Sequence, residues 1–259
     1  MIKWLLSKFN PKKRVCYETK FITNIKKDVK DSRDYTLNFV NLKGIELPEK
    51  FDLEEYCPPL RDQGDIGSCG SHAFISAIEI MRTIRNPNQF IDLSELFHYY
   101  VVRDTLTQTT EDTDKDDGQS LREGASILKN IGVAPEVLWA YDVTRYKDQP
   151  SNLSYVFARL FRIKAYYRLY NLFDVQKAIC NKQPVVFGLW VDNEFIQRRY
   201  NRIVSSIGPH LIGGHAMTVI GYDNINNRFL IRGSWGENHR EIPYDVFREN
   251  LIDMWCVEI

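Results

Sequence analysis

A cysteine stands where a Gly-rich turn meets an apolar helical pattern, in the stretch RDQGDIGSCGSHAF at residues 61–74. The start of a helix carries partial positive charge and unpaired N–H groups, and both stabilise a thiolate. We therefore predict that Cys69 has a lowered pKa and acts as a nucleophile, although most free cysteines are inert core residues. Attack on a carbonyl carbon also requires a base that later protonates the leaving group.

Five histidines are candidates for that base: His72, His98, His210, His215 and His239. The best placed is His215, because it follows Gly213 and Gly214 and opens a predicted strand. Two glycines leave its ring accessible from a facing lobe, and a strand holds the ring in place. By contrast, His72 lies one turn into the predicted helix, where packing or hydrogen bonding is the simpler expectation.

Helical periodicity dominates the first half of the chain. Apolar residues at helical spacing follow Cys69 as far as Asn86–Pro87, and a second helix is expected from Ser94. Ser120 and Glu123 have the spacing of a capping box at the start of a third helix. The acidic segment between these last two helices, at 111–117, is expected to be solvated surface.

Strand patterns dominate the second half. PVVFGLWV (184–191), HAMTVIGYD (215–223) and RFLIRGSW (228–235) indicate strands, the last two joined by a turn at 224–227. A short helix is expected around 175–180. Helices followed by strands predict an α+β protein with two lobes.

Composition excludes several classes of function. The chain has 259 residues, a formal net charge of zero and a pI near 7.0, so no electrostatic feature favours a nucleic-acid partner. No stretch approaches the roughly 20 apolar residues that a membrane span needs. Neither a nucleic-acid partner nor a membrane span is therefore expected.

The cysteines are odd in number and widely spaced: Cys16, Cys57, Cys69, Cys180 and Cys256. A disulfide framework is therefore not expected, and a reducing compartment is. Because the C-x-x-H pair at 69–72 has no second pair at zinc-site spacing, neither a metal nor a cofactor is expected. With no signal-peptide pattern at the start, the predicted location is a cytoplasm, or a virion and host cytoplasm.

Eight segments carry a family resemblance through their shared order: SRDYT (32–36), LPEKFDLEEYCPPLRDQG (47–64), IGSCGSHAFISAIE (66–79), DGQSLREGASILKNIGVAPEVLWAYD (117–142), GGHAMTVIGYD (213–223), RFLIRGSWG (228–236), IPYDVF (242–247) and LIDMWCVEI (251–259). The chain resembles the papain-like cysteine peptidases, most closely the bacterial and viral branch without a long inhibitory propeptide. This resemblance implies a two-lobed α+β fold, with a helical lobe, a β-barrel-like lobe and the active site in the cleft between them.

The resemblance also implies a role for each matching residue. Cys69 would be the nucleophile, and His215 its general base and then acid. Gln63 would donate its side-chain amide to the oxyanion hole, where a fixed donor stabilises charge that develops only in the transition state. Trp235 would shield the histidine from water, and Gly67–Ser68 would shape the turn beside the substrate.

One position departs from the family pattern. Where the family has an asparagine that orients the histidine, this chain has Gly233. Loss of an orienting group reduces the rate by a few-fold to roughly 10⁴. A backbone carbonyl, a water or a neighbour such as Asn238 could replace it, and Gly233→Asn should raise activity if misorientation is the only fault.

Two hypotheses follow: a cysteine endopeptidase, or an impaired relative that binds a peptide or protein. The expected domains are an N-terminal extension (1–47), which is either a short pro-segment or a packed arm, and a peptidase domain (48–259). Within that domain, the helical lobe is expected at about 60–140 and the β-rich lobe at about 141–259.

Overall fold

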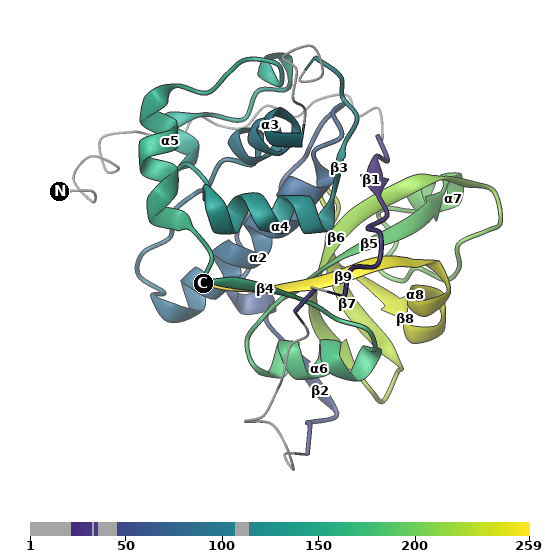
Figure 1. The fold of residues 1–259 in the computed structure, drawn as a ribbon. Coiled ribbons are helices and arrows are strands. Elements are labelled where there is room, and N and C mark those ends of the chain that lie inside the picture. Colours follow the sequence, from purple (N-terminus) through teal and green to yellow (C-terminus); the bar gives the residue numbers. More distant parts are fainter. Residues whose placement is uncertain (1–21, 33, 36–45, 107–113) are drawn as a thin grey trace.

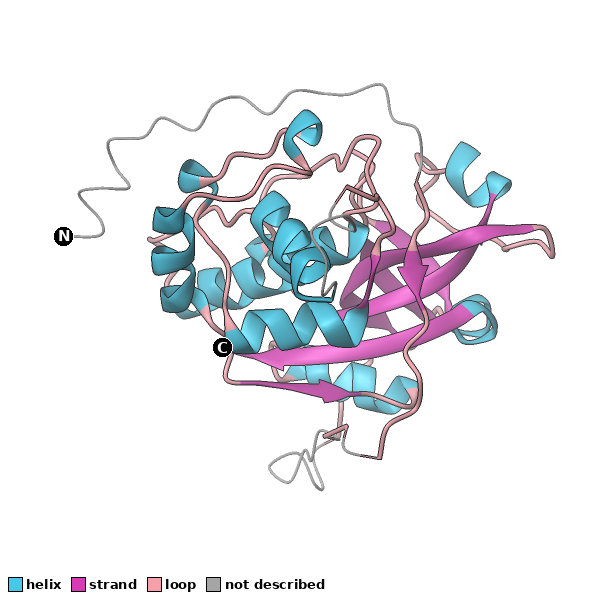
Figure 2. Ribbon diagram, turned by 45° about the horizontal axis from the view of Figure 1, so that its top comes forward, coloured by secondary structure: helices cyan, strands magenta, loops and turns pink. Residues whose placement is uncertain are grey.

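The computed structural model describes residues 22–32, 34–35, 46–106 and 114–259 (Figure 1). Cys16, the basic head of the chain and part of the acidic segment lie outside these ranges. Helices gather on one side of the molecule and a large sheet on the other (Figure 2). The predicted α+β class is therefore confirmed.

The helical side is built on α2 (Cys69–Arg85), which α3 (Glu95–Leu106), α4 (Leu121–Asn130) and α5 (Asn152–Ala158) surround. Residues that the sequence predicted as caps lie at the end of α2 and at the start of α4. Asn86 is the C-cap of α2, and Ser120 with Glu123 forms both hydrogen bonds of a capping box at α4. Short 3-10 turns link the elements, at Glu54–Tyr56, Glu136–Leu138, Val143–Arg145 and Arg159–Phe161.

Within the described residues the sheet has seven strands: β2 (Lys50–Asp52), β4 (Ala165–Arg168), β5 (Val185–Asp192), β6 (Leu211–Asp223), β7 (Arg228–Arg232), β8 (Arg240–Pro243) and β9 (Leu251–Glu258). Their order is β4-β9-β5-β6-β7-β8, and β2 pairs with β6. Because β4 and β8 end this order without pairing with each other in the described chain, the sheet is open and not a closed barrel. Three smaller helices pack around it: α6 (Leu172–Cys180), α7 (Asn193–Gln197) and α8 (Tyr244–Asn250).

Two hydrophobic clusters fill the molecule. The helical cluster centres on Phe74 and Phe97 but also includes Phe161 and Ile163, so helical packing continues past residue 140. The second cluster lies between the sheet and its helices, around Phe187 and other buried apolar side chains. The Thr218 hydroxyl on β6 donates to the Ala73 carbonyl on α2, at 2.9 Å, and joins the two halves.

A short N-terminal segment crosses the junction between these halves (Figure 1). We call residues 22–32 and 34–35 the N-terminal strap. Its strand β1 (Ile25–Lys26) pairs in parallel with β3 (Gln119–Ser120) on the helical side, while Asn24 bridges to Gly214 on the sheet. The strap thus bonds to both halves at once. None of the helices in the described ranges is long and apolar enough to cross a membrane.

Candidate active site

Cys69 is the first residue of α2 and is completely buried. Burial raises the pKa of its thiol to about 11, although backbone N–H groups of Ala216, Gly70 and Asn24 face the sulfur and oppose this. The prediction of a lowered pKa is therefore wrong for this structure. The helix start stabilises the thiolate as expected, but the sulfur is completely buried, and the loss of its hydration outweighs that stabilisation.

His215 lies on β6, directly before the residue whose backbone N–H faces the Cys69 sulfur. Its ring stacks on Trp235 with 3.7 Å between the ring centroids and 14° between their planes. Neither ring nitrogen has a hydrogen-bond partner among the described residues. Burial lowers the pKa of His215 to about 3, and the nearby His72 and Arg240 lower it further. The covered site thus holds a neutral His215 imidazole and a protonated Cys69 thiol.

Gln63 is fully buried, and its side chain is fixed at both ends. Its Nε2 donates to the Ile66 carbonyl at 2.9 Å, and its Oε1 accepts from the Ser234 hydroxyl at 2.7 Å. Since a side-chain amide has two N–H hydrogens, one remains for an oxyanion. The amide is therefore held rigidly, as an oxyanion-hole donor must be.

The segment that carries Gln63 is tied to the helices by a buried guanidinium. Arg61 forms ion pairs with Glu79 of α2, at 2.7 Å, with Asp92, at 2.5 Å, and with Glu95 of α3. Burial raises the pKa of Glu79 to about 7, which Arg61 opposes. This cluster of ion pairs fixes the segment that carries Gln63 to α2 and α3.

The turn before Cys69 is held by residues from two other segments. The Gly67 N–H donates to Asp116 Oδ1 at 2.8 Å, and the Tyr99 hydroxyl also donates to Asp116. Ser68 contacts the Tyr141 hydroxyl at 2.7 Å through its own hydroxyl. The expectation that the acidic segment is only solvated surface is wrong for Asp116, because its carboxylate accepts hydrogen bonds from a backbone N–H and a tyrosine hydroxyl.

The strap approaches the site so closely that glycines are required beneath it. A side chain on Gly118, whose φ is +67°, would overlap the Asn24 carbonyl oxygen, and one on Gly213 would overlap Thr23. An ideal Cβ on Gly214 would lie 2.8 Å from the Ile25 carbonyl oxygen. Gly213 and Gly214, expected to leave His215 open, instead admit the strap beside it.

Charged residues anchor the far end of the strap. Asp34 bonds to Arg122 at 2.6 Å and to Arg168 at 3.1 Å, and the Asp28 N–H donates to Asp253 at 2.7 Å. Burial acts to raise the pKa of Asp34, but the bonds from the two arginines hold it below its ordinary value. The strap therefore remains anchored while Asp34 is ionised.

The space that the family asparagine would fill is occupied by another side chain. An ideal Cβ on Gly233 would overlap Glu237 Oε1 and lie 2.9 Å from Glu237 Cδ. Glu237 is buried, and its Oε2 accepts from the Trp235 N–H at 2.6 Å. The sequence analysis missed Glu237, and the one available signal was a carboxylate in the turn that follows Gly233.

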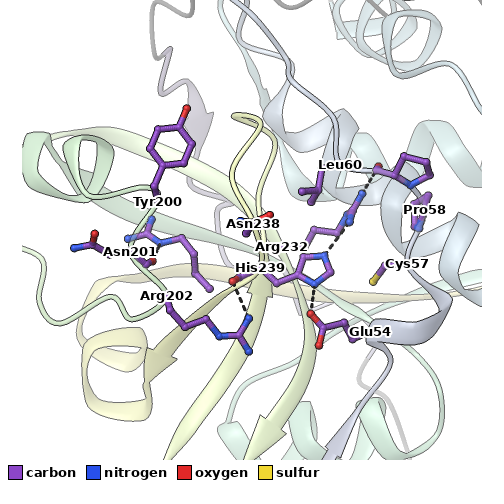
Figure 3. Close-up of a pocket in the computed structure, with 12 residues that line it drawn as sticks. Glu54, Cys57, Pro58, Leu60, Tyr200, Asn201, Arg202, Arg232, Asn238 and His239 are labelled. Carbon is purple, nitrogen blue, oxygen red and sulfur yellow. Dashed lines mark hydrogen bonds and ion pairs between the residues drawn. The ribbon is translucent and has the colours of Figure 1, made fainter. Parts of the chain in front are cut away.

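Asn238, considered from the sequence as a replacement, instead lines a separate cavity of about 550 Å³ (Figure 3). Neither Cys69 nor His215 lines this cavity. In it, His239 donates through Nδ1 to Glu54 at 2.7 Å and accepts at Nε2 from Arg232 at 2.9 Å. This histidine is held neutral between fixed partners.

Groups that could bind a metal are not assembled in the described chain, which contains no cluster of three His, Cys, Asp or Glu side chains suited to a metal. Cys57, Cys69, Cys180 and Cys256 are all free thiols. His72, predicted to be a packed helix residue, has its Nδ1 3.1 Å from the Ser68 carbonyl and its ring against Tyr141. That prediction is confirmed.

Comparison with known proteins agrees with this arrangement. A model of the papain family of cysteine proteases matches residues 47–254. An uncharacterised peptidase C1-like protein of Acanthamoeba polyphaga mimivirus is 28% identical over 76% of this chain and 68% of its own length. Zingipain-2 of Zingiber officinale is 27% identical over 80% of this chain and 90% of its own.

Solved structures show the same fold. Xylellain, a cysteine protease from Xylella fastidiosa, superposes with a TM-score of 0.78 and 26% identity, covering 95% of this chain and 98% of its own. Procathepsin L 3 from Tenebrio molitor larval midgut superposes with a TM-score of 0.67 over 92% of this chain and 76% of its own. The chain belongs to the papain family of cysteine proteases, as the resemblance predicted.

Proposed function

We propose that the protein is a cysteine endopeptidase that cleaves peptide bonds through a thioester on Cys69. The observation that carries the proposal is that Ala216, the residue after His215, faces the Cys69 sulfur while Gln63 is fixed nearby. Cys69 and His215 belong to opposite halves of the molecule, so the contact between sulfur and imidazole on which the proposal depends would form across their junction.

The chemistry follows from this arrangement. His215 takes the thiol proton, and the Cys69 thiolate attacks the substrate carbonyl carbon. Gln63 and the Cys69 N–H stabilise the resulting oxyanion, and the imidazolium protonates the leaving amine. Water, deprotonated by His215, then hydrolyses the thioester. Trp235 excludes solvent from one face of the ring.

An epoxide-type thiol inhibitor tests the proposal directly. In the chain whose strap is loosened by the Asp34→Asn change described below, we expect it to label Cys69 alone and to stop peptide turnover, while Cys69→Ala in the same background abolishes both. Cys57→Ala, which removes a thiol of the separate cavity, is the matched control and should keep both. Absence of labelling and of turnover at every pH from 5 to 8, in the full chain and in the strap variant described below, would reject the proposal.

We also infer that the strap acts as a pro-segment that keeps the enzyme inactive. Two observations support this: Asn24 faces the Cys69 sulfur, and Thr23 and Ile25 occupy the space beside the glycines that precede His215. A substrate carbonyl must reach the sulfur through this space, so the strap must move or be cut before catalysis.

Weakening the anchor tests the inhibitory role of the strap. Asp34→Asn removes the charge that bonds to Arg122 and Arg168, so we expect alkylation of Cys69 to accelerate several-fold. Asp148→Asn, in an exposed ion pair with Arg145, is a control of equal charge change. Equal alkylation rates in both variants and the wild type would show that the strap does not limit access.

The second candidate is an impaired relative that binds a peptide or protein. Gly233 and the unbonded ring of His215 favour it. It predicts a stable fold and peptide binding without turnover. Labelling of Cys69 without any release of product, in a protein whose strap is loosened, would select this candidate.

A further inference from the structure

We propose that Glu237 is the positioning residue for His215, in place of the family asparagine. This inference rests on the proposed peptidase function. The Glu237 carboxylate, four residues after Gly233, would orient the histidine ring, as the neutral amide of an asparagine does in the family pattern.

The path of the chain brings Glu237 to this place. Thr218 pairs with Arg232 in the antiparallel β6–β7 ladder, so the residues after Arg232 continue toward the His215 end of β6. The stacking of Trp235 on His215 fixes that approach. The chain then turns, and the Glu237 side chain folds back over Gly233 into the volume where an asparagine side chain would begin.

This carboxylate is built into the site. Only 2% of Glu237 is exposed, and its Oε2 accepts from the Trp235 N–H, so one turn holds both the shielding ring and the carboxylate. Glycine at position 233 is also explained, since any side chain there would overlap Glu237 Oε1. The two positions therefore depend on each other.

The surroundings determine how the carboxylate acts. The charges of His72 on α2 and Arg240 on β8 oppose a proton on His215. The charges of Arg240, Arg232 and Asp62 act on Glu237. A carboxylate that accepts from one ring nitrogen stabilises the imidazolium more than an amide does. In the strap-covered structure this bond is not formed in the described chain. We place it in the open enzyme, once Cys69 has given its proton to the ring.

Exchange of the two positions in the strap-loosened Asp34→Asn background is the main test, with kcat and KM measured against pH. We expect Glu237→Ala to lower kcat by about 100-fold with KM within a factor of three, which is within the range for loss of an orienting group. Gly233→Asn alone should also lower kcat, because the new side chain meets Glu237. The double variant Gly233→Asn with Glu237→Ala should recover activity to within about tenfold of the wild type, since it recreates the family arrangement.

Glu237→Gln separates positioning from simple packing, because it keeps the shape and removes the charge. We expect a kcat reduced about tenfold and a basic limb of the pH profile moved down by about one unit, since the imidazolium loses its charged partner. Glu241→Gln, on the same sheet but paired with Arg202 and Arg228, is the matched control and should leave the limb unchanged. This variant also decides the question if Glu237→Ala does not fold.

The inference is overturned if Glu237→Gln keeps the wild-type limb, or if the double variant is no more active than Glu237→Ala. These outcomes differ from failure of the proposed function, in which the wild type itself shows no labelling and no turnover. In that case NMR titration of the His215 ring in the Asp34→Asn background decides. A lower His215 pKa in Glu237→Gln supports the positioning role, and an equal pKa rejects it.

Discussion

His98 and His215 are both completely buried, but they differ in the hydrogen bonding of their ring nitrogens. His98 lies within the helical half, where its Nδ1 is 2.9 Å from the Ser71 hydroxyl and its Nε2 donates to the Gly124 carbonyl at 2.9 Å. His215 lies where the two halves meet and has no such bond in the described chain. Burial lowers the pKa of His98 to about 4 and that of His215 to about 3.

The difference concerns what each ring is free to do. Both nitrogens of His98 are hydrogen-bonded to other groups of the protein, so a proton transfer there would break these hydrogen bonds. His215 is held by the face of its ring, through Trp235, and its nitrogens remain available for a thiol and a carboxylate. A buried polar group without a partner reduces stability, and such groups occur where chemistry requires them.

The largest expected effect comes from His215→Gln. We expect kcat to fall by about 10³–10⁴, the scale for removal of a catalytic base, with the free energy of unfolding unchanged or raised. Stability does not suffer because the wild-type ring makes no hydrogen bond that the variant loses. Turnover and urea denaturation of the same protein measure both quantities. A stability loss as large as that of His98→Ala would contradict the contrast between the two histidines.

Gln63→Ala should have the next largest effect, a fall in kcat of about 10²–10³, because it removes one oxyanion donor. KM should change little, since the donor acts on charge that develops in the transition state. Gln176→Ala, which removes an amide bonded to Asn224 far from the site, is the control for kcat and KM. A change confined to KM would show that Gln63 binds the substrate and does not stabilise the oxyanion.

His98→Ala tests the other half of the comparison. It leaves a cavity in the helical core and the Gly124 carbonyl without its donor, so we expect a loss of about 2–4 kcal/mol in unfolding free energy. Epoxide labelling of Cys69 in the folded fraction should persist. Urea denaturation together with labelling would show whether the fixed histidine has a structural role alone.

These contrasts show which parts of the site were predictable from sequence. Caps and periodicity are local, so the bounds of α2 and α4 followed from Asn86 and from the box of Ser120 and Glu123. The prediction that Cys69 and His215 act together came from the order of motifs in a known family. Each prediction used information carried by neighbouring residues or by a shared motif.

Other features depend on contacts between segments far apart in the chain, which a pattern does not contain. Complete burial of Cys69 reverses the expected direction of its pKa shift, and the strap's Asn24 is among the residues whose backbone faces the sulfur. Asp116 accepts from Gly67 because the acidic segment folds back on the nucleophile turn. Glu237 fills the place of a missing side chain only because the turn after β7 brings it there.

The remaining expected effect is a pH dependence of the free energy of unfolding. His98 and His215 have folded-state pKa values of about 4 and about 3, below the ordinary value of 6.5. As pH falls below 6.5, the histidines of the unfolded chain bind protons that those of the folded chain do not. Their contribution to the free energy of unfolding is therefore fully present above pH 6.5 and decreases toward pH 4. Each histidine contributes a slope of up to about 1.4 kcal/mol per pH unit.

Urea denaturation of the wild type and of His215→Gln at a series of pH values isolates the contribution of His215. Between pH 6 and 4 the free energy of unfolding should fall less steeply in the variant than in the wild type, and the difference in slope should be about the contribution of one histidine. It should match the wild type in slope between pH 7 and 8, where both states of the ring are neutral. Equal slopes in the acid range would mean that His215 carries its proton in the folded enzyme, with Glu237 or the thiolate as its partner.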